Sequence, residues 1–155
     1  MAGRLTEEQI TKVILKWLSS SGWHILCFDF PQSGTGYILH QNQELRTTKN
    51  KGAIIPDIVA IKDKKCVFFE NKDRFVLNDF RKIETLRTKS NYNESITKLL
   101  FGQGVENIFF GVGLPKQSSV EAKILEHKNL IDFALIVENE TKEVTLSASF
   151  ILLPK

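Results

Sequence analysis

The chain has 155 residues, with 21 lysines and arginines against 18 aspartates and glutamates and a net charge of +3. This length predicts one domain over residues 1–155, large enough to fold without disulfides or a structural metal. The apolar and charged fractions are those of a soluble globular protein. The charge is compatible with a nucleic-acid partner but does not by itself argue for one.

Two classes of protein are excluded by local patterns. No apolar run reaches the length that crosses a bilayer, and Glu7 and Glu8 stand where a signal peptide would need an apolar stretch. Cys27 and Cys66 lie in apolar runs and form no CxxC pair, so we expect two free, buried thiols rather than a disulfide framework. Reduced thiols and the absence of a leader predict a cytoplasmic protein without a membrane segment.

The first predicted element is a helix that begins after Thr6 and ends between Ser19 and Gly22. Thr6 and Gln9 form a capping-box pattern, and Leu5 is placed for the matching hydrophobic staple. Apolar residues recur inside it at helical spacing: Ile10, Val13, Ile14, Trp17 and Leu18. A strand over 23–30, a turn-rich break over 31–36, a short strand over 37–39 and a basic loop to Gly52 are expected next.

Two strands over 57–61 and 66–72 follow, joined by a polar turn at Asp63 and Lys64. Helices are expected over 78–88 and 94–101, then a strand over 107–112 that is buried on both faces. Ser118 and Glu121 form a second capping-box pattern, which predicts a helix to about Lys128. Strands over 132–137 and 143–148 end the chain. This order predicts an α/β domain with a mixed central sheet flanked by helices.

The stretch from Pro56 to Lys72 contains the residues with the most specific chemistry. If its strands pair as a hairpin about the Asp63–Lys64 turn, Asp57 lies opposite Glu70 on one face of the sheet. Lys72 points to the same face because it is two residues beyond Glu70. This register is inferred from the turn.

Two facing carboxylates at the end of apolar strands repel each other and need a partner. A divalent cation such as Mg²⁺, for which Mn²⁺ can substitute, takes carboxylate oxygens, water and substrate phosphate as ligands. It also lowers the pKa of bound water, while a lysine can orient that water or hold a phosphate oxygen. Asp57, Glu70 and Lys72 are therefore the candidate catalytic residues of a phosphodiester hydrolase. A surface hairpin with an ordinary Glu70–Lys72 ion pair is the alternative.

The stretch PDIVAIKDKKCVFFENK resembles the signature of the PD-(D/E)XK nuclease superfamily, which includes restriction endonucleases and Holliday-junction resolvases. The resemblance extends coarsely from Glu7 to about Val112, and it implies a restriction endonuclease-like core. It implies that Asp57 and Glu70 ligate Mg²⁺, that the backbone carbonyl of Asn71 is a further ligand and that Lys72 assists the nucleophile. Asn71 departs from the often apolar residue at its position, but its side chain is expected to point away from the site.

Glu7 is a further candidate metal ligand. Helical geometry places it near the apolar stripe of the first helix, whereas Glu8 points away. Members of the superfamily often carry an acid on the first helix that reaches the metal. An acid that only interacts with the helix dipole is an equally good interpretation.

The aromatic and histidine side chains are expected to have no part in the chemistry. The former are expected in the core (Phe28, Phe30, Phe109 and Phe110), and the latter show no metal-ligand spacing (His24, His40 and His127).

Two basic segments are candidate contacts for nucleic acid. The first has three cations, Arg46, Lys49 and Lys51, which can neutralise phosphates beside hydrogen-bonding threonines and asparagine. The second has four, Arg81, Lys82, Arg87 and Lys89. A solvated face or loop explains each segment equally well.

These patterns together predict a Mg²⁺-dependent endonuclease of double-stranded DNA that resembles a small type II restriction enzyme. A structure-selective nuclease such as a junction resolvase, and a DNA-binding protein that keeps the fold without cutting, are the alternatives. Cleavage of both strands is simplest with two active sites, so a homodimer is expected.

Overall fold

The computed structural model describes residues 5–30, 37–39, 53–88, 92–138, 141 and 143–149. Its backbone is an α/β arrangement in which six strands form one mixed sheet in the order β1-β2-β3-β4-β5-β6. The predicted α/β class and mixed sheet flanked by helices are confirmed. None of the helices within the described residues is long and apolar enough to cross a bilayer.

The first half of the sheet is antiparallel and the middle is parallel. β1 (His24–Phe28), β2 (Ile58–Lys62) and β3 (Lys65–Asn71) pair antiparallel in sequence. β3, β4 (Asn107–Pro115) and β5 (Phe133–Val137) then pair parallel, and β6 (Val144–Ser149) returns antiparallel to β5. Parallel neighbours need crossover connections, and helices provide them.

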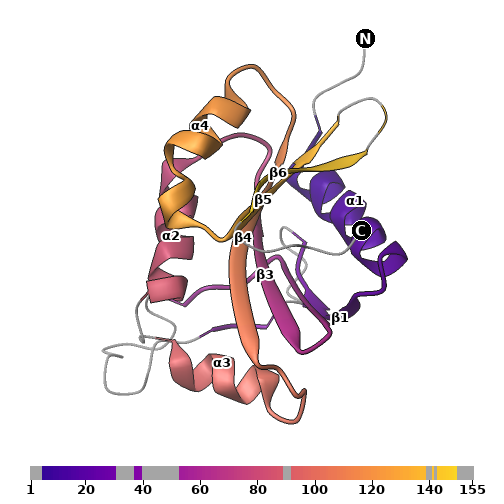
Figure 1. Ribbon diagram of the computed structural model, residues 1–155, viewed down its shortest axis with the longest axis vertical. Helices are drawn as coiled ribbons and strands as arrows, with labels where there is room; N and C mark the ends of the chain where they lie inside the picture. The colour runs from indigo at the N-terminus through magenta and orange to yellow at the C-terminus, as the bar shows by residue number, and fades with distance from the viewer. Residues whose placement is uncertain are drawn as a thin grey trace.

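Those helices lie on one side of the sheet and α1 lies on the other, as Figure 1 shows. α2 (Leu77–Thr88) and α3 (Asn93–Leu100) connect β3 to β4, while α4 (Val120–Glu126) and a short 3₁₀ helix (Lys128–Leu130) connect β4 to β5. α1 (Glu7–Ser20) precedes the sheet. Each face of the sheet therefore has its own apolar core.

The alternation of side chains along β2 and β3 divides residues between these cores. Ile58, Val67 and Phe69 pack with α1, whereas Val59 and Phe68 pack with α2. Glu70 continues the second set by the same alternation, and its contact with Lys82 places it on the α2 face. Asn71 belongs to the α1 face.

The predicted start of α1 is confirmed in detail. Thr6 is the N-cap, its Oγ1 accepts from the Gln9 N–H at 3.1 Å, and Gln9 Oε1 accepts from the Thr6 N–H at 2.8 Å. Two of the four unpaired N–H groups of the first turn are satisfied in this way. The helix therefore begins at a defined residue, which sets the position of Glu7.

The second capping box was a wrong prediction. The helix begins at Val120, and its N-cap is Ser119, whose φ of 70° is left-handed and whose side chain makes no capping bond. With Ser119 as the N-cap, Ser118 lies before the cap and Glu121 is the second helical residue instead of the third, so the two cannot form the motif. The helix is also shorter than predicted, because a 3₁₀ turn replaces its end.

Other differences concern burial at strand ends. β4 is longer than predicted, and it is buried only from Phe110 onward, since Asn107 and Ile108 begin it at the exposed edge of the fold. The strand predicted over 23–30 is shorter, and within the described ranges 37–39 contributes a single bridge, between Leu39 and Ile54. Both cysteines are free as predicted, although only Cys66 is fully buried.

Candidate active site

The predicted hairpin register is present between β2 and β3. Ile61 pairs with Cys66 and Val59 with Phe68, about a turn in which Asp63 and Lys64 have φ values of 50° and 67°. Positive φ at both turn residues is the geometry of a two-residue hairpin. Regular pairing ends at Ile58 and Phe69, so Asp57 and Glu70 lie just past the end of the ladder.

Asp57 adds a side-chain contact to its backbone hydrogen bonds at that point. Its N–H donates to the Phe69 carbonyl at 2.9 Å, and its Oδ2 accepts from the Asn71 N–H at 2.6 Å. The Asp57 carbonyl accepts from the Asp29 N–H at 2.9 Å. The carboxylate is therefore held at the start of β2, next to the β3 residues that follow Phe69.

Asp57 and Glu70 are both buried, with 8% of each residue exposed. Burial and the charge of Glu70 raise the pKa of Asp57 to about 8, although the Asn71 N–H opposes the shift. Burial also raises the pKa of Glu70 to about 7, against the opposing charge of Lys82. Each carboxylate is thus in an environment that disfavours its charged form, and a cation would relieve both.

Glu7 reaches this cluster from the other side of the sheet. Its Oε2 lies 3.8 Å from Lys72 Nζ at the N-terminal end of α1. Burial raises the pKa of Glu7, which Lys72 opposes. Glu8 instead pairs with Lys12 at 3.5 Å on the exposed face. The expected difference in facing between Glu7 and Glu8 is confirmed, while ligation of a metal by Glu7 stays a prediction.

Asn71 connects β3 to α1. It is fully buried, and its Nδ2 donates to Thr11 Oγ1 at 3.0 Å. Its side chain thus points away from Glu70 as predicted, and only its backbone faces the carboxylates.

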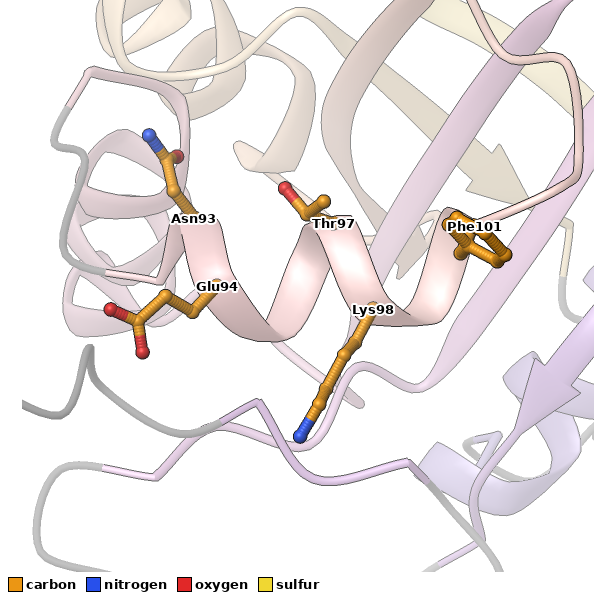
Figure 2. Close-up of a pocket in the computed structure, with 5 residues that line it drawn as sticks. All are labelled: Asn93, Glu94, Thr97, Lys98 and Phe101. Atoms are coloured by element: carbon orange, nitrogen blue, oxygen red, sulfur yellow. The ribbon is translucent and has the colours of Figure 1, made fainter.

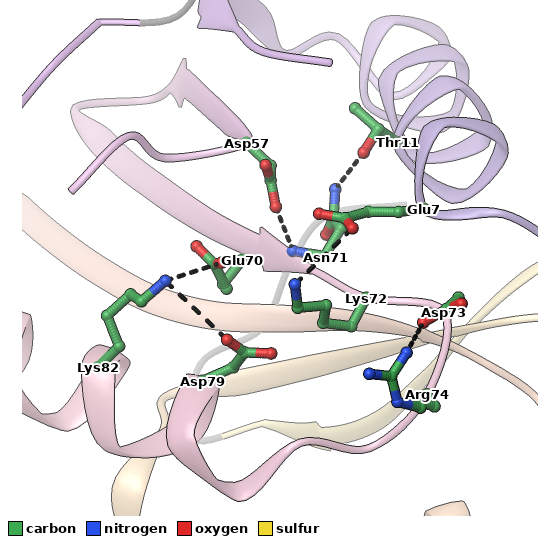
Figure 3. A network of polar contacts seen from close by, with 10 residues as sticks. All are labelled: Glu7, Thr11, Asp57, Glu70, Asn71, Lys72, Asp73, Arg74, Asp79 and Lys82. Carbon is green, nitrogen blue, oxygen red and sulfur yellow. Dashed lines mark hydrogen bonds and ion pairs between the residues drawn. The ribbon is translucent and has the colours of Figure 1, made fainter. Parts of the chain in front are cut away.

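Two residues of α2 complete the cluster, and no sequence pattern singled out Asp79. Lys82 Nζ lies 3.3 Å from Glu70 Oε1 and 3.9 Å from Asp79 Oδ1 (Figure 3). Lys82 was expected only as part of a basic segment. The three-residue spacing of Asp79 and Lys82 predicts a shared helix face, but nothing local indicates that this face meets Glu70.

The residues of the two basic segments have different outcomes. Arg46, Lys49 and Lys51 lie outside the described residues, as do Lys89 and His40. Arg87 points elsewhere on α2 and pairs with Asp132 at 3.0 Å.

The core prediction for the phenylalanines holds only in part. Phe110 is buried, but Phe28 is 39% exposed and packs against the half-buried Phe30 at 5.3 Å between ring centroids. Phe28 is the last residue of β1 and Phe30 follows it, and β1 is an edge strand of the sheet.

A pocket beside α3 is separate from the cluster. It is lined by one face of that helix and by Phe101, as Figure 2 shows: Asn93, Glu94, Thr97, Lys98 and Phe101. α3 leads into the first residues of β4, whereas Glu70 is level with Val112 near the far end of that strand. The pocket therefore contributes no group to the carboxylates.

The donor set of the cluster fits Mg²⁺. Two buried carboxylates with raised pKa values offer the hard oxygen ligands that this ion takes, and Mg²⁺ completes its shell with water. Asp79 adds a buried oxygen, Oδ2, without a hydrogen-bond partner. Across the described ranges, no three His, Cys, Asp or Glu side chains already converge as a metal site. The fit is therefore that of a site with few protein ligands.

Comparison with known proteins adds little. No protein-family model and no curated protein matches this chain. Among solved structures it is similar to an FdxN element excision controlling factor protein from Anabaena variabilis, at 15% identity and a TM-score of 0.45, over 90% of this chain and 98% of that one. A likeness this weak carries no argument about function.

Proposed function

We propose that this protein is a Mg²⁺-dependent endonuclease that hydrolyses phosphodiester bonds of DNA, on a restriction endonuclease-like core. The observation that supports this most is the buried Asp57–Glu70 pair beside Lys72 at the end of two apolar strands. A pair of this kind is unfavourable without a cation, and a cation beside a lysine is suited to attack on a phosphate.

Asp57 and Glu70 would hold the metal through their carboxylates, with the Asn71 backbone carbonyl beside them. When bound, Mg²⁺ would supply a water of lowered pKa and would neutralise charge on the phosphate. The protein's own contribution starts with Asp57, whose carboxylate is oriented by the Asn71 N–H. Orientation of a ligand before binding lowers the cost of ordering it afterwards.

Lys72 would act on the reacting groups directly. Its side chain is 31% exposed and comes from the residue that follows β3, so it can reach a substrate in solvent. Its ammonium can donate hydrogen bonds to a phosphate oxygen or orient the attacking water. Glu7, at 3.8 Å, limits the positions that Lys72 can adopt.

Double-stranded DNA is the proposed substrate, and two copies of the chain would cut its two strands. The test is incubation of the protein with a plasmid and with a four-way junction, each with Mg²⁺ and with chelator. We expect Mg²⁺-dependent cleavage of the plasmid, and none by the Asp57→Ala protein.

Each other result points to a different conclusion. Cleavage of the junction alone would favour a structure-selective nuclease. Binding of DNA without cleavage would favour a non-catalytic role. Full cleavage in chelator, or by Asp57→Ala, would contradict the proposed site.

A further inference from the structure

Lys82 is shared unequally between two buried acids. Its Nζ lies 3.3 Å from Glu70 Oε1, to which it donates a hydrogen bond, and 3.9 Å from Asp79 Oδ1. The acid side chains are only 9% and 10% exposed, whereas that of Lys82 is 38% exposed. The cation therefore has room to move between two acceptors that are held in place.

Asp79 has one carboxylate oxygen whose capacity to accept hydrogen bonds is not used by the described residues. Its Oδ2 is buried and has no hydrogen-bond partner in the part of the chain that is described. A buried carboxylate oxygen without a donor is costly, and it is rarely left so. Lys82 thus contacts Glu70 while a second acid on its own helix stays incompletely satisfied.

The contact with Lys82 also bears on the metal. A Glu70 oxygen that accepts from Lys82 is engaged on the α2 side, whereas Asp57 accepts from the Asn71 N–H. Glu70 is thus paired with a cation from the protein itself.

We propose that Lys82 is the counter-ion of Glu70 in the metal-free protein, that a divalent metal replaces it there, and that Lys82 then moves onto Asp79. The inference rests on the proposed function, because it takes Glu70 as a metal ligand. Asp79 and Lys82 are three residues apart on α2, so a side-chain rotation is sufficient for the exchange. Neither state leaves the charge of Glu70 without a partner, which a buried carboxylate requires. Lys82 is in this sense a positioning residue.

The test is Mn²⁺ binding measured by calorimetry on the wild type, Lys82→Met, Asp79→Asn and the double variant. Lys82→Met removes the cation that competes for Glu70, so it should bind Mn²⁺ about tenfold more tightly than the wild type. That size is within the usual range for coupled side chains. Asp79→Asn should weaken binding in the wild type, because Lys82 then has no other acid to move to. In the Lys82→Met background the same change should have little effect.

Arg81→Met is the matched control. It removes one positive charge from the neighbouring position of α2, where the side chain is exposed, so Mn²⁺ affinity should stay within about twofold. Lys82→Gln, which keeps a polar end, should tighten binding as Lys82→Met does. Circular dichroism verifies that each variant is folded.

The outcomes separate this inference from the proposed function. Equal tightening by Arg81→Met would show a general charge effect and overturn the exchange. Equal weakening by Asp79→Asn in both backgrounds would make Asp79 a ligand in its own right and also overturn it. If Lys82→Met binds Mn²⁺ as the wild type does, only the exchange is contradicted. If the wild type does not bind Mn²⁺, both proposals are contradicted.

Discussion

Lys72 differs from the two carboxylates of the site in that it has no expected role as a ligand. We therefore predict that Lys72→Met lowers the cleavage rate by at least about a hundredfold, the scale of a lost proton-transfer or charge-stabilising group. Mn²⁺ affinity should change far less than it does in Asp57→Ala. Parallel cleavage assays and calorimetry measure the two effects, and a joint loss of both in Lys72→Met would contradict this division of roles.

Glu7 and Glu8 are adjacent and share the first turn of α1, so their interactions with the helix dipole are similar. Only Glu7 contacts Lys72. Glu7→Gln should reduce Mg²⁺-dependent cleavage about tenfold or more, as expected when a group that supports a metal site is lost. Glu8→Gln, which breaks only the exposed pair with Lys12, is the control and should keep wild-type activity. Equal activities would leave Glu7 with a role in the helix alone.

At the scale of elements, the position of α1 against the sheet depends on a buried polar contact. Asn71 Nδ2 donates to Thr11 Oγ1, and both residues are at most 1% exposed. Gly113 of β4 allows this approach, because a Cβ there would come within 2.3 Å of Ile14 Cδ1 and 2.5 Å of Asn71 Oδ1. Helix and sheet are thus in close contact beneath the site, and the same contact sets where Glu7 lies.

Thr11→Val tests this contact with almost no change in shape. It leaves the Asn71 amide buried without its acceptor, which should lower the free energy of unfolding by about 2 kcal/mol. Thr88→Val is the control, since its hydroxyl bonds to Glu84 on an exposed helix surface. Urea denaturation compares the two, and a similar small loss in both would mean that the Thr11–Asn71 bond contributes little.

For the whole molecule, the raised pKa values predict how stability varies with pH. Burial raises the pKa of Asp57 to about 8 and that of Glu70 to about 7 in the folded protein, against about 4 in the unfolded chain. Between these values the folded state binds more protons, so its stability falls as pH rises. Urea denaturation in chelator at about pH 5 and about pH 9 should show this fall, and Asp57→Asn should reduce it. If the wild type were as stable at pH ~9 as at pH ~5, the raised pKa values of the buried pair would be contradicted.

Mg²⁺ links the site to the stability of the whole fold. An ion that binds only the folded state raises the melting temperature. The rise should be clear in the wild type and small in Asp57→Asn, which has lost one anionic ligand. In chelator at about pH 9, where Asp57 is ionised, Asp57→Asn should be the more stable protein by about 1 kcal/mol, because one of two neighbouring charges is gone. Thermal melts of both proteins in Mg²⁺ and in chelator measure this, and an identical Mg²⁺ response would remove most of the case for a metal site.

The sequence by itself determined the features that depend on near neighbours. The capping box of α1 and the hairpin register from Ile61 to Phe68 both follow from turn chemistry and periodicity over a few residues. That register was enough to bring Asp57 and Glu70 to one end of the strands. The capping box predicted at Ser118 was wrong, because the left-handed backbone of Ser119 makes that residue the N-cap instead.

Only the tertiary structure decided which distant groups share the site. Asp79 and Lys82 lie near Glu70 because α2 crosses over one face of the sheet. Glu7 contacts Lys72 because α1 covers the other face and begins close to the end of β3. The exposure of Phe28 likewise depends on what packs beside β1. Periodicity indicates which face of an element is apolar, but it carries no information on which element that face will meet. The packing of helices against a sheet settles that choice, since it depends on long-range contacts that no single segment of the chain contains.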